Sequence, residues 1–267
     1  MTTASIELDH RPAVDYLLRL GDTCLVLGQR LAEWCGHAPV LEEDIALANM
    51  GLDLVGQARA LLTHAGALEG RGKDRVYSED QLAFLREERD YLNPTLVELP
   101  NGVGGRRDFA FTVLRNGLVA TFLELLWQRL SASSDAELAA IAGKAVKEAR
   151  YHRRHAADWV VRLGDGTDES HRRAQAALDE LWPYVAELFE SDAVDEAAAA
   201  SGLGPRWSEL REPWLERVRP VLAEATLAEP GESGFRSGGR RGVHSEHMGY
   251  LLAEMQHLQR AFPGAVW

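Results

Sequence analysis

The residues with the clearest potential for chemistry lie between Ala142 and Leu163, a stretch whose spacing predicts one long helix. Glu148, His152 and His155 recur at i, i+4 and i+7 and therefore share one face. A carboxylate and an imidazole on an inward helix face are what a di-iron bundle uses to hold metal. In such bundles the pair is Glu-x-x-His, but here Tyr151 stands three residues after Glu148. The stretch therefore resembles a metal-binding helix in the residue types on one face, but it lacks the Glu-x-x-His spacing of the ligands.

A carboxylate-bridged di-iron site needs a carboxylate from each of two helices and Glu-x-x-His from each of the other two. The first predicted helix offers Asp22, and the second offers Asp53 with Gly56 three residues on. The third contains a single acid, Glu124, which projects well away from its apolar stripe. Neither expected histidine is present. His152 could still reach inward, so the weak binding of a single metal ion is an alternative.

We favour a hydrogen-bonded network in the space that a metal would take, because buried charges need polar partners. Its members would be the degenerate site positions Asp22, Asp53, Glu148 and His152. In particular, we expect Asp53 and Glu148 to be buried near each other, since they lie beside the apolar stripes of the second and fourth helices. The alternative is a working metal centre.

Four long helices, each with apolar residues at three- and four-residue spacing, are expected to position these residues. A short turn joins the first two, which should be antiparallel neighbours, and a long irregular connection follows them. That connection suits a bundle with one crossover, as in ferritin-like folds. The expected helices are Pro12–Cys35, Leu41–His64, Phe109–Leu130 and a fourth from Ser134 or Asp135 to about Gly164.

Two patterns on the first two helices predict how they pack. Gly21 and Gly28 lie on the apolar stripe of the first helix and suggest close approach by another helix. The apolar side of the second helix is assigned to Ile45, Ala48, Leu52, Val55 and Leu62.

Three further helices are expected near His171–Glu190, Trp207–Ala225 and Ser245–Ala261, and no strand pattern is evident. The predicted fold is all-α, a ferritin-like four-helix bundle with additional C-terminal helices. We treat residues 1–267 as one domain, with the core bundle at about 12–164 and a C-terminal helical extension at 165–267.

Composition excludes several classes of protein. The formal net charge is -12, which argues against a general binder of nucleic acid or anionic membranes. No signal peptide is recognisable, and no apolar run approaches the ~20 residues of a membrane span. Cys24 and Cys35 lie roughly 16 Å apart along one predicted helix, too far for a disulfide, and are expected to be small core residues. A cytoplasmic location fits these observations.

A second candidate site precedes the last predicted helix. The glycines of Ser237–Gly242 expose backbone N–H groups, and Arg240 and Arg241 can grip a phosphate or a partner's carboxylate. His244 and His247 follow as further interface or anion-binding candidates. We expect both arginines to be exposed; a plain mobile surface loop is the alternative.

Four segments resemble the C subunits of the bacterial phenylacetyl-CoA epoxidases, which are ring-oxygenating multicomponent monooxygenases. The resemblance covers nearly the whole chain and is most specific in Leu18–Leu62, Lys147–Ser170, Leu181–Phe189 and Ser237–Trp267. It implies two paralogous ferritin-like subunits. The di-iron ligands and the binding of phenylacetyl-CoA belong to the A subunit, whereas the C subunit has lost the metal site and supports its paralogue.

The resemblance therefore implies a non-catalytic structural subunit of aerobic phenylacetate degradation, with no cofactor in this chain. Its expected partners are the A subunit and other epoxidase components, including a reductase. We expect Ser237–Trp267 to order the contact with the A subunit or to lie close to its CoA pocket. The aromatic region around Trp207, Trp214 and Trp267 is a further candidate for the interface. The rival interpretations are an iron-dependent ferritin-like oxygenase active on its own and a metal-storage module, which would also need inward acids.

Overall fold

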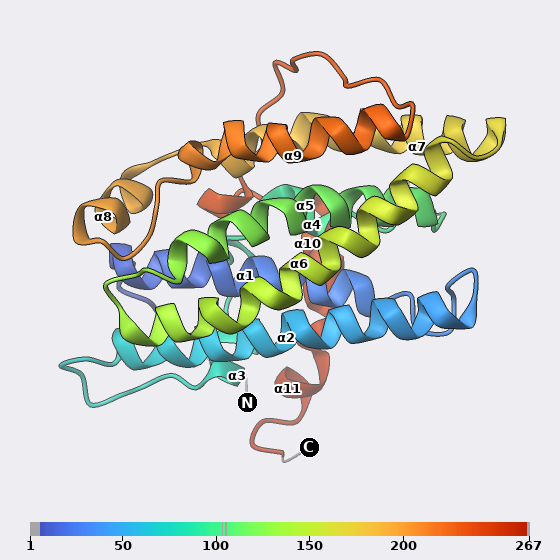
Figure 1. Ribbon diagram of the computed structural model, residues 1–267. Coiled ribbons are helices and arrows are strands. Elements are labelled where there is room, and N and C mark those ends of the chain that lie inside the picture. Colours follow the sequence, from blue (N-terminus) through green and yellow to red (C-terminus); the bar gives the residue numbers. More distant parts are fainter. Residues whose placement is uncertain (1–5, 103, 105, 266–267) are drawn as a thin grey trace.

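Two helical hairpins form the body of the protein, seen here in a computed structural model (Figure 1). Helix α1 (Pro12–Ala32) packs along α2 (Leu41–Glu69), and α5 (Phe109–Leu130) packs along α6 (Ala136–Gly164). One long connection joins the hairpins, which is the single-crossover arrangement of ferritin-like folds. The predicted all-α bundle is confirmed. The structure describes residues 6–102, 104 and 106–265.

Local signals explain where these helices begin. Pro12 occupies the first turn of α1, where its missing N–H costs nothing. The side chain of Asp108 accepts a hydrogen bond from the backbone N–H of Ala110 at 2.8 Å and caps α5. Asp135 accepts from the N–H of Leu138 at 3.0 Å and caps α6. These caps agree with the predicted start of the third helix at Phe109 and of the fourth at Ser134 or Asp135.

The hairpin of α1 and α2 is tight because glycines line its contact. A Cβ atom built on Gly28 would lie 3.2 Å from the carbonyl oxygen of Gly51, and one on Gly21 would lie 2.9 Å from Cδ2 of Leu62. The close approach predicted for these glycines is confirmed.

Shorter elements cover the two hairpins. Between α2 and α5 the chain forms α3 (Glu79–Phe84), η1 (Glu88–Asp90) and α4 (Thr95–Glu98), so the long connection predicted to be irregular contains short helical turns. The C-terminal elements are α7 (Asp168–Leu181), η2 (Trp182–Phe189), α8 (Ala193–Ser201), η3 (Trp207–Leu210), α9 (Arg211–Glu224), η4 (Gly239–Arg241), α10 (Glu246–Met255) and α11 (His257–Ala261).

The C-terminal elements wrap the bundle on two sides (Figure 1). Helices α7 and α9 contact α5 and α6, whereas α8 contacts α1. The chain then returns through η4 and α10 to the crossover beside α4. The predicted helix over residues 171–190 is interrupted, since Pro183 falls in the 3-10 turn after α7.

Helix α5 is the core helix of the bundle. It is long and apolar enough to cross a membrane by length and composition, but 89% of its most apolar window is buried inside the protein. Burial by α6, α7 and α9 accounts for that composition.

Two predictions of burial are wrong. Leu62 of the assigned apolar side of α2 is buried, but the rest of that side is turned outward, with Leu52 69% exposed and Ile45 54% exposed, because most of the core contact is made by the opposite face. Cys35 is exposed because α1 ends before it, whereas Cys24 is buried; both are free cysteines. The residues of α2 that enter the core are Leu47, Met50, Leu54, Ala58, Leu61, Leu62, Ala65 and Leu68.

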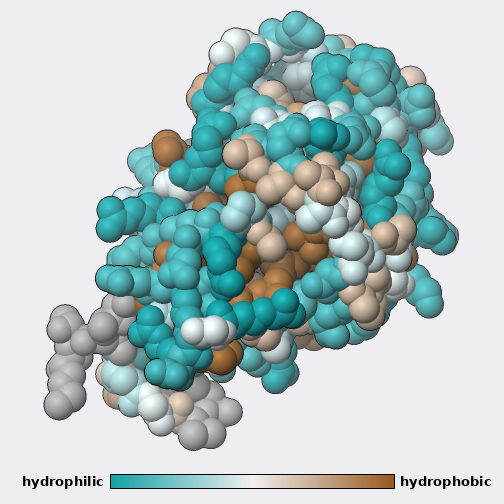
Figure 2. Space-filling view, turned by 90° about the vertical axis from the view of Figure 1, so that its left-hand side faces the viewer, coloured by the Kyte–Doolittle hydropathy of each residue, from teal (hydrophilic) through white to brown (hydrophobic). Residues whose placement is uncertain are grey.

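The surface is mainly hydrophilic. Figure 2 shows one end of the molecule, where a hydrophobic patch lies among hydrophilic residues. In the described chain, the exposed large hydrophobic side chains fall mostly in two stretches, residues 40–55 and 235–262.

Candidate functional site

The four degenerate site positions do not meet in one network. Asp22 on α1 is fully buried and forms a two-pronged ion pair with Arg86, which donates from Nη1 to Oδ2 at 3.0 Å and from Nη2 to Oδ1. The backbone N–H of Leu92 donates to the same carboxylate at 2.9 Å. The guanidinium of Arg86 lies 4.3 Å from the ring centre of Tyr91. Asp22 therefore fastens the crossover segment to α1.

The other three positions lie on a polar seam between α2 and α6. Nε2 of His152 lies 3.1 Å from Oδ2 of Asp53, and Nε2 of Gln57 donates to Oε2 of Glu148 at 2.9 Å. Two further acid–imidazole pairs, Glu43–His155 at 2.7 Å and His64–Asp135 at 2.9 Å, extend the seam in both directions. We call these four pairs the α2–α6 ladder.

The ladder is open to solvent at its middle. The Asp53 side chain is 38% exposed and the Glu148 side chain 18% exposed, although the His152 side chain is only 2% exposed. The predicted burial of Asp53 in the bundle centre is therefore wrong. The carboxylates of Asp53 and Glu148 do not pair with each other. Each has a polar partner on the opposite helix, His152 for Asp53 and Gln57 for Glu148.

Glu124, the single acid of α5, is held by arginines. Its side chain is 4% exposed and lies 2.5 Å from Nε of Arg153, 3.2 Å from Nε of Arg150 and 3.1 Å from Nη1 of Arg217. Burial alone would raise the pKa of Glu124, but the arginines outweigh it and hold the pKa below its ordinary value. This carboxylate links α5 to α6 and α9.

These donors do not fit a carboxylate-bridged di-iron centre. Such a centre needs free carboxylates and two imidazoles converging from four helices. Here the carboxylates of Asp22 and Glu124 are bound by guanidinium groups. Those of Asp53 and Glu148 are bound by His152 and Gln57 between α2 and α6. Within the described residues, no group of three or more His, Cys, Asp or Glu side chains could hold a metal ion.

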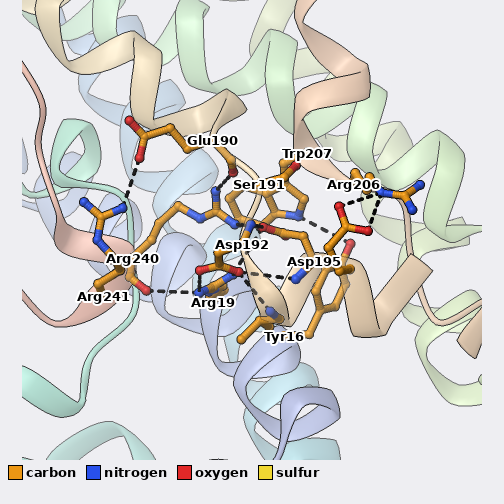
Figure 3. A network of polar contacts seen from close by, with 12 residues as sticks. Tyr16, Arg19, Glu190, Ser191, Asp192, Asp195, Arg206, Trp207, Arg240 and Arg241 are labelled. Carbon is orange, nitrogen blue, oxygen red and sulfur yellow. Dashed lines mark hydrogen bonds and ion pairs between the residues drawn. The ribbon is translucent and has the colours of Figure 1, made fainter. Parts of the chain in front are cut away.

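The predicted exposure of Arg240 is wrong. Arg240 is 4% exposed and donates from Nη2 to both carboxylate oxygens of Asp195, at 3.0 and 2.8 Å (Figure 3). Its guanidinium lies 4.1 Å from the ring centre of Trp207. A planar cation with a bidentate acid and an aromatic face is well satisfied in the interior. Arg240 therefore pins η4 to α8.

A second cation completes this buried cluster. Arg19 on α1 donates from Nη1 to Oδ1 of Asp192 at 2.8 Å and from Nη2 to the carbonyl oxygen of Arg240 at 3.3 Å (Figure 3). Despite partial burial, Arg19 holds the pKa of Asp192 well below its ordinary value. For Asp195, desolvation outweighs the arginines and raises the pKa. The cluster joins α1, α8 and η4 across the fold.

The remaining C-terminal candidates also have structural partners. Nδ1 of His244 lies 2.7 Å from Oε2 of Glu98, and its Nε2 lies 2.9 Å from the carbonyl oxygen of Tyr91. Arg241 is exposed and pairs with Glu190 at 3.1 Å. The carbonyl oxygen of His247 accepts from Arg30 at 3.4 Å.

The aromatic residues proposed as surface anchors lie inside the protein. Trp207 is 0% exposed and Trp214 1% exposed, and the indole N–H of Trp214 donates to the carbonyl oxygen of Leu118 at 2.9 Å. Both belong to the core, so that part of the expected interface is wrong. Trp267 lies outside the described residues.

Comparison with known proteins decides the family. The model for the phenylacetic acid catabolic protein family matches residues 1–267. The chain belongs to that family. It is also 50% identical over 252 residues to the C subunit of 1,2-phenylacetyl-CoA epoxidase from Escherichia coli (strain K12), a match that covers 94% of this chain and 98% of that protein. The resemblance recognised in the sequence is confirmed.

Sequence reasoning missed the buried ion pairs that organise this family member. Arg19 and Asp192 are 173 residues apart, and Asp22 and Arg86 are 64 apart, so no local spacing could pair them. One signal was present: Arg19 and Asp22 stand within the apolar stretch of α1, where a charge needs a partner.

Proposed function

We propose that this chain is the non-catalytic structural subunit of a multicomponent phenylacetyl-CoA epoxidase in aerobic phenylacetate degradation. It would support a paralogous A subunit that holds the di-iron centre and binds the thioester, and it would need no metal of its own. The 50% identity to the C subunit of such an epoxidase supports the assembly.

One observation carries the non-catalytic part of this proposal. The positions at which α2 and α6 would present Glu-x-x-His form the α2–α6 ladder, in which Asp53 is bound by His152 and Glu148 by Gln57. A working centre would need both carboxylates turned inward with a histidine three residues after each. Gly56 and Tyr151 stand at those places, and Tyr151 is 51% exposed.

The chain's own residues would act by holding a rigid surface. Buried ion pairs fix the crossover to α1 through Asp22 and fix η4 to α8 through Arg240. A partner could then bind without first ordering these segments, which lowers the entropic cost of association.

The double variant Asp53→Asn/Glu148→Gln tests this proposal. It removes the carboxylates of Asp53 and Glu148 as metal ligands while keeping the shapes of these side chains. Assembled with the A subunit, a reductase and oxygen, the variant complex should epoxidise phenylacetyl-CoA at a rate within about threefold of the wild-type complex. A loss of turnover comparable to the removal of a catalytic group, about 100-fold or more, would show that these acids take part in the chemistry.

A further inference from the structure

Helix α2 has two apolar faces, and only one of them enters the core. On the outer face Leu41 is 71% exposed, Ile45 54%, Leu52 69% and Val55 38%, and Ala48 is half-buried between them. At about 100° per residue, these five positions fall within an arc of about 80°. We call them the α2 stripe.

The α2 stripe is too continuous to be chance exposure. Single exposed apolar residues are ordinary, but contiguous apolar patches mark interaction sites. From Leu41 to Val55 the stripe runs for about 21 Å, at about 1.5 Å per residue, without a charged residue in its line.

The neighbouring helix α6 differs from α2, because its outward side is charged. On the outward side of α6, Asp158 is exposed at i+7 from Tyr151, and Lys144 pairs with Glu148 at 3.5 Å. The other exposed residues on this side are the cations Lys144, Lys147 and Arg154, at i−7, i−4 and i+3 from the exposed Tyr151. We call these four residues the α6 band. It is basic, although the chain as a whole carries a formal charge of -12.

The stripe and the band belong to adjacent helices, because the α2–α6 ladder joins them side by side (Figure 1). The ring of Tyr151 lies 6.1 Å from that of His152 and 6.2 Å from that of His155, both of which are members of the ladder. The chain thus presents an apolar line on α2, and a row of cations with an aromatic ring on the adjacent helix α6. That combination favours a partner with an apolar helix face and acidic side chains beside it.

We propose that the α2 stripe, with the α6 band beside it, is the docking surface for the A subunit, which would present an apolar helix flanked by acids. This inference rests on the proposed function, and it specifies which face of the chain would bind the A subunit. It moves the interface away from Ser237–Trp267 and from the aromatic region around Trp207, because Arg240 and Trp207 are buried.

The test compares two matched double variants of the full-length chain. Ile45→Glu/Leu52→Glu places charge in the α2 stripe, and Tyr250→Glu/Leu258→Glu does the same at side chains that are 74% and 51% exposed on α10 and α11. Glutamate is a good helix former, so both variants should keep a melting temperature close to that of the wild type. Affinity for the purified A subunit is measured by titration calorimetry and sedimentation.

We expect the stripe variant to bind the A subunit about 30-fold more weakly or worse, as when a central anchor is lost, and the control to bind normally. Equal binding by the stripe variant, or a loss confined to the control, would overturn the inference and leave the proposed function standing. Failure of the wild type to bind the A subunit would defeat the proposed function itself. If the wild type alone dimerises and the stripe variant does not, the occupant is a second copy and the inference is wrong.

Charge reversal gives an independent test should the stripe variant fold poorly. Lys147→Glu/Arg154→Glu changes only exposed residues of α6. It should weaken binding at low salt, and the difference should shrink at about 1 M salt, where charges are screened beyond about 3 Å. If this variant binds the A subunit at low salt as tightly as the wild type does, the α6 band is not part of the interface and that part of the inference is wrong.

Discussion

Arg240 binds Asp195 through both carboxylate oxygens, and neither side chain of this pair is more than 4% exposed. The pair joins η4 to α8, two segments that are 45 residues apart in the chain. A loop that looks like a mobile basic patch in the sequence is therefore a fixed part of the fold.

Arg240→Ala should be strongly destabilising because it leaves Asp195 as a buried carboxylate without its main partner. Breaking a buried pair in this way costs about 3–5 kcal/mol, which corresponds to a fall in melting temperature of roughly 5–9 °C for a chain of this length. Arg241→Ala is the matched control: its side chain is 55% exposed, so the free energy of unfolding should change by no more than about 0.5 kcal/mol. Equal melting temperatures for the two variants in a thermal scan would contradict the structural role of Arg240.

Asp22 and Asp53 should differ sharply in their effect on stability, although both occupy degenerate site positions. Asp22→Leu leaves the fully buried Arg86 unpaired and should lower the free energy of unfolding by about 3–5 kcal/mol. Asp53→Leu leaves a single imidazole, that of His152, without its partner and should cost about 1–3 kcal/mol. Denaturant titration measures both, and the reverse order would contradict the described seam.

Stability should decline on the alkaline side of neutrality because of His244. Burial alone lowers the pKa of this imidazole, but the hydrogen bond and charge of Glu98 and the carbonyl of Tyr91 outweigh it and raise the pKa above 6.5. Its contribution is therefore complete below about pH 6.5 and is lost as the pH rises through the higher pKa of the folded state. In His244→Gln the loss of stability above pH 6.5 should be smaller than in the wild type. Parallel pH profiles of the free energy of unfolding would show that His244 does not contribute.

The sequence predicts the helices well where the signal is local. Phe109–Leu130 is recovered with both ends because Asp108 caps it and its apolar pattern is long. The absence of metal-binding histidines from α2 and α6 can also be predicted from local spacing. Gly56 and Tyr151 stand three residues after Asp53 and Glu148, where a di-iron helix would have histidine.

Contacts between residues that are distant in the sequence could not be predicted from the sequence. Both faces of α2 are apolar, so periodicity could not tell that Leu54 is buried and Leu52 exposed. Nor could it tell that Arg240 meets Asp195 rather than solvent, because this contact brings together distant segments. The assignment of Asp22 to the same network as His152 fails for the same reason: its partner comes from the crossover.

The most direct measurement of the central claim is the turnover of phenylacetyl-CoA by this chain alone. The purified protein, incubated with ferrous iron and supplied with a reductase and oxygen, should form no epoxide above the protein-free background, and adding the A subunit should start the reaction. Sustained epoxide formation by the isolated chain, at a rate comparable to that of the complex, would contradict the account.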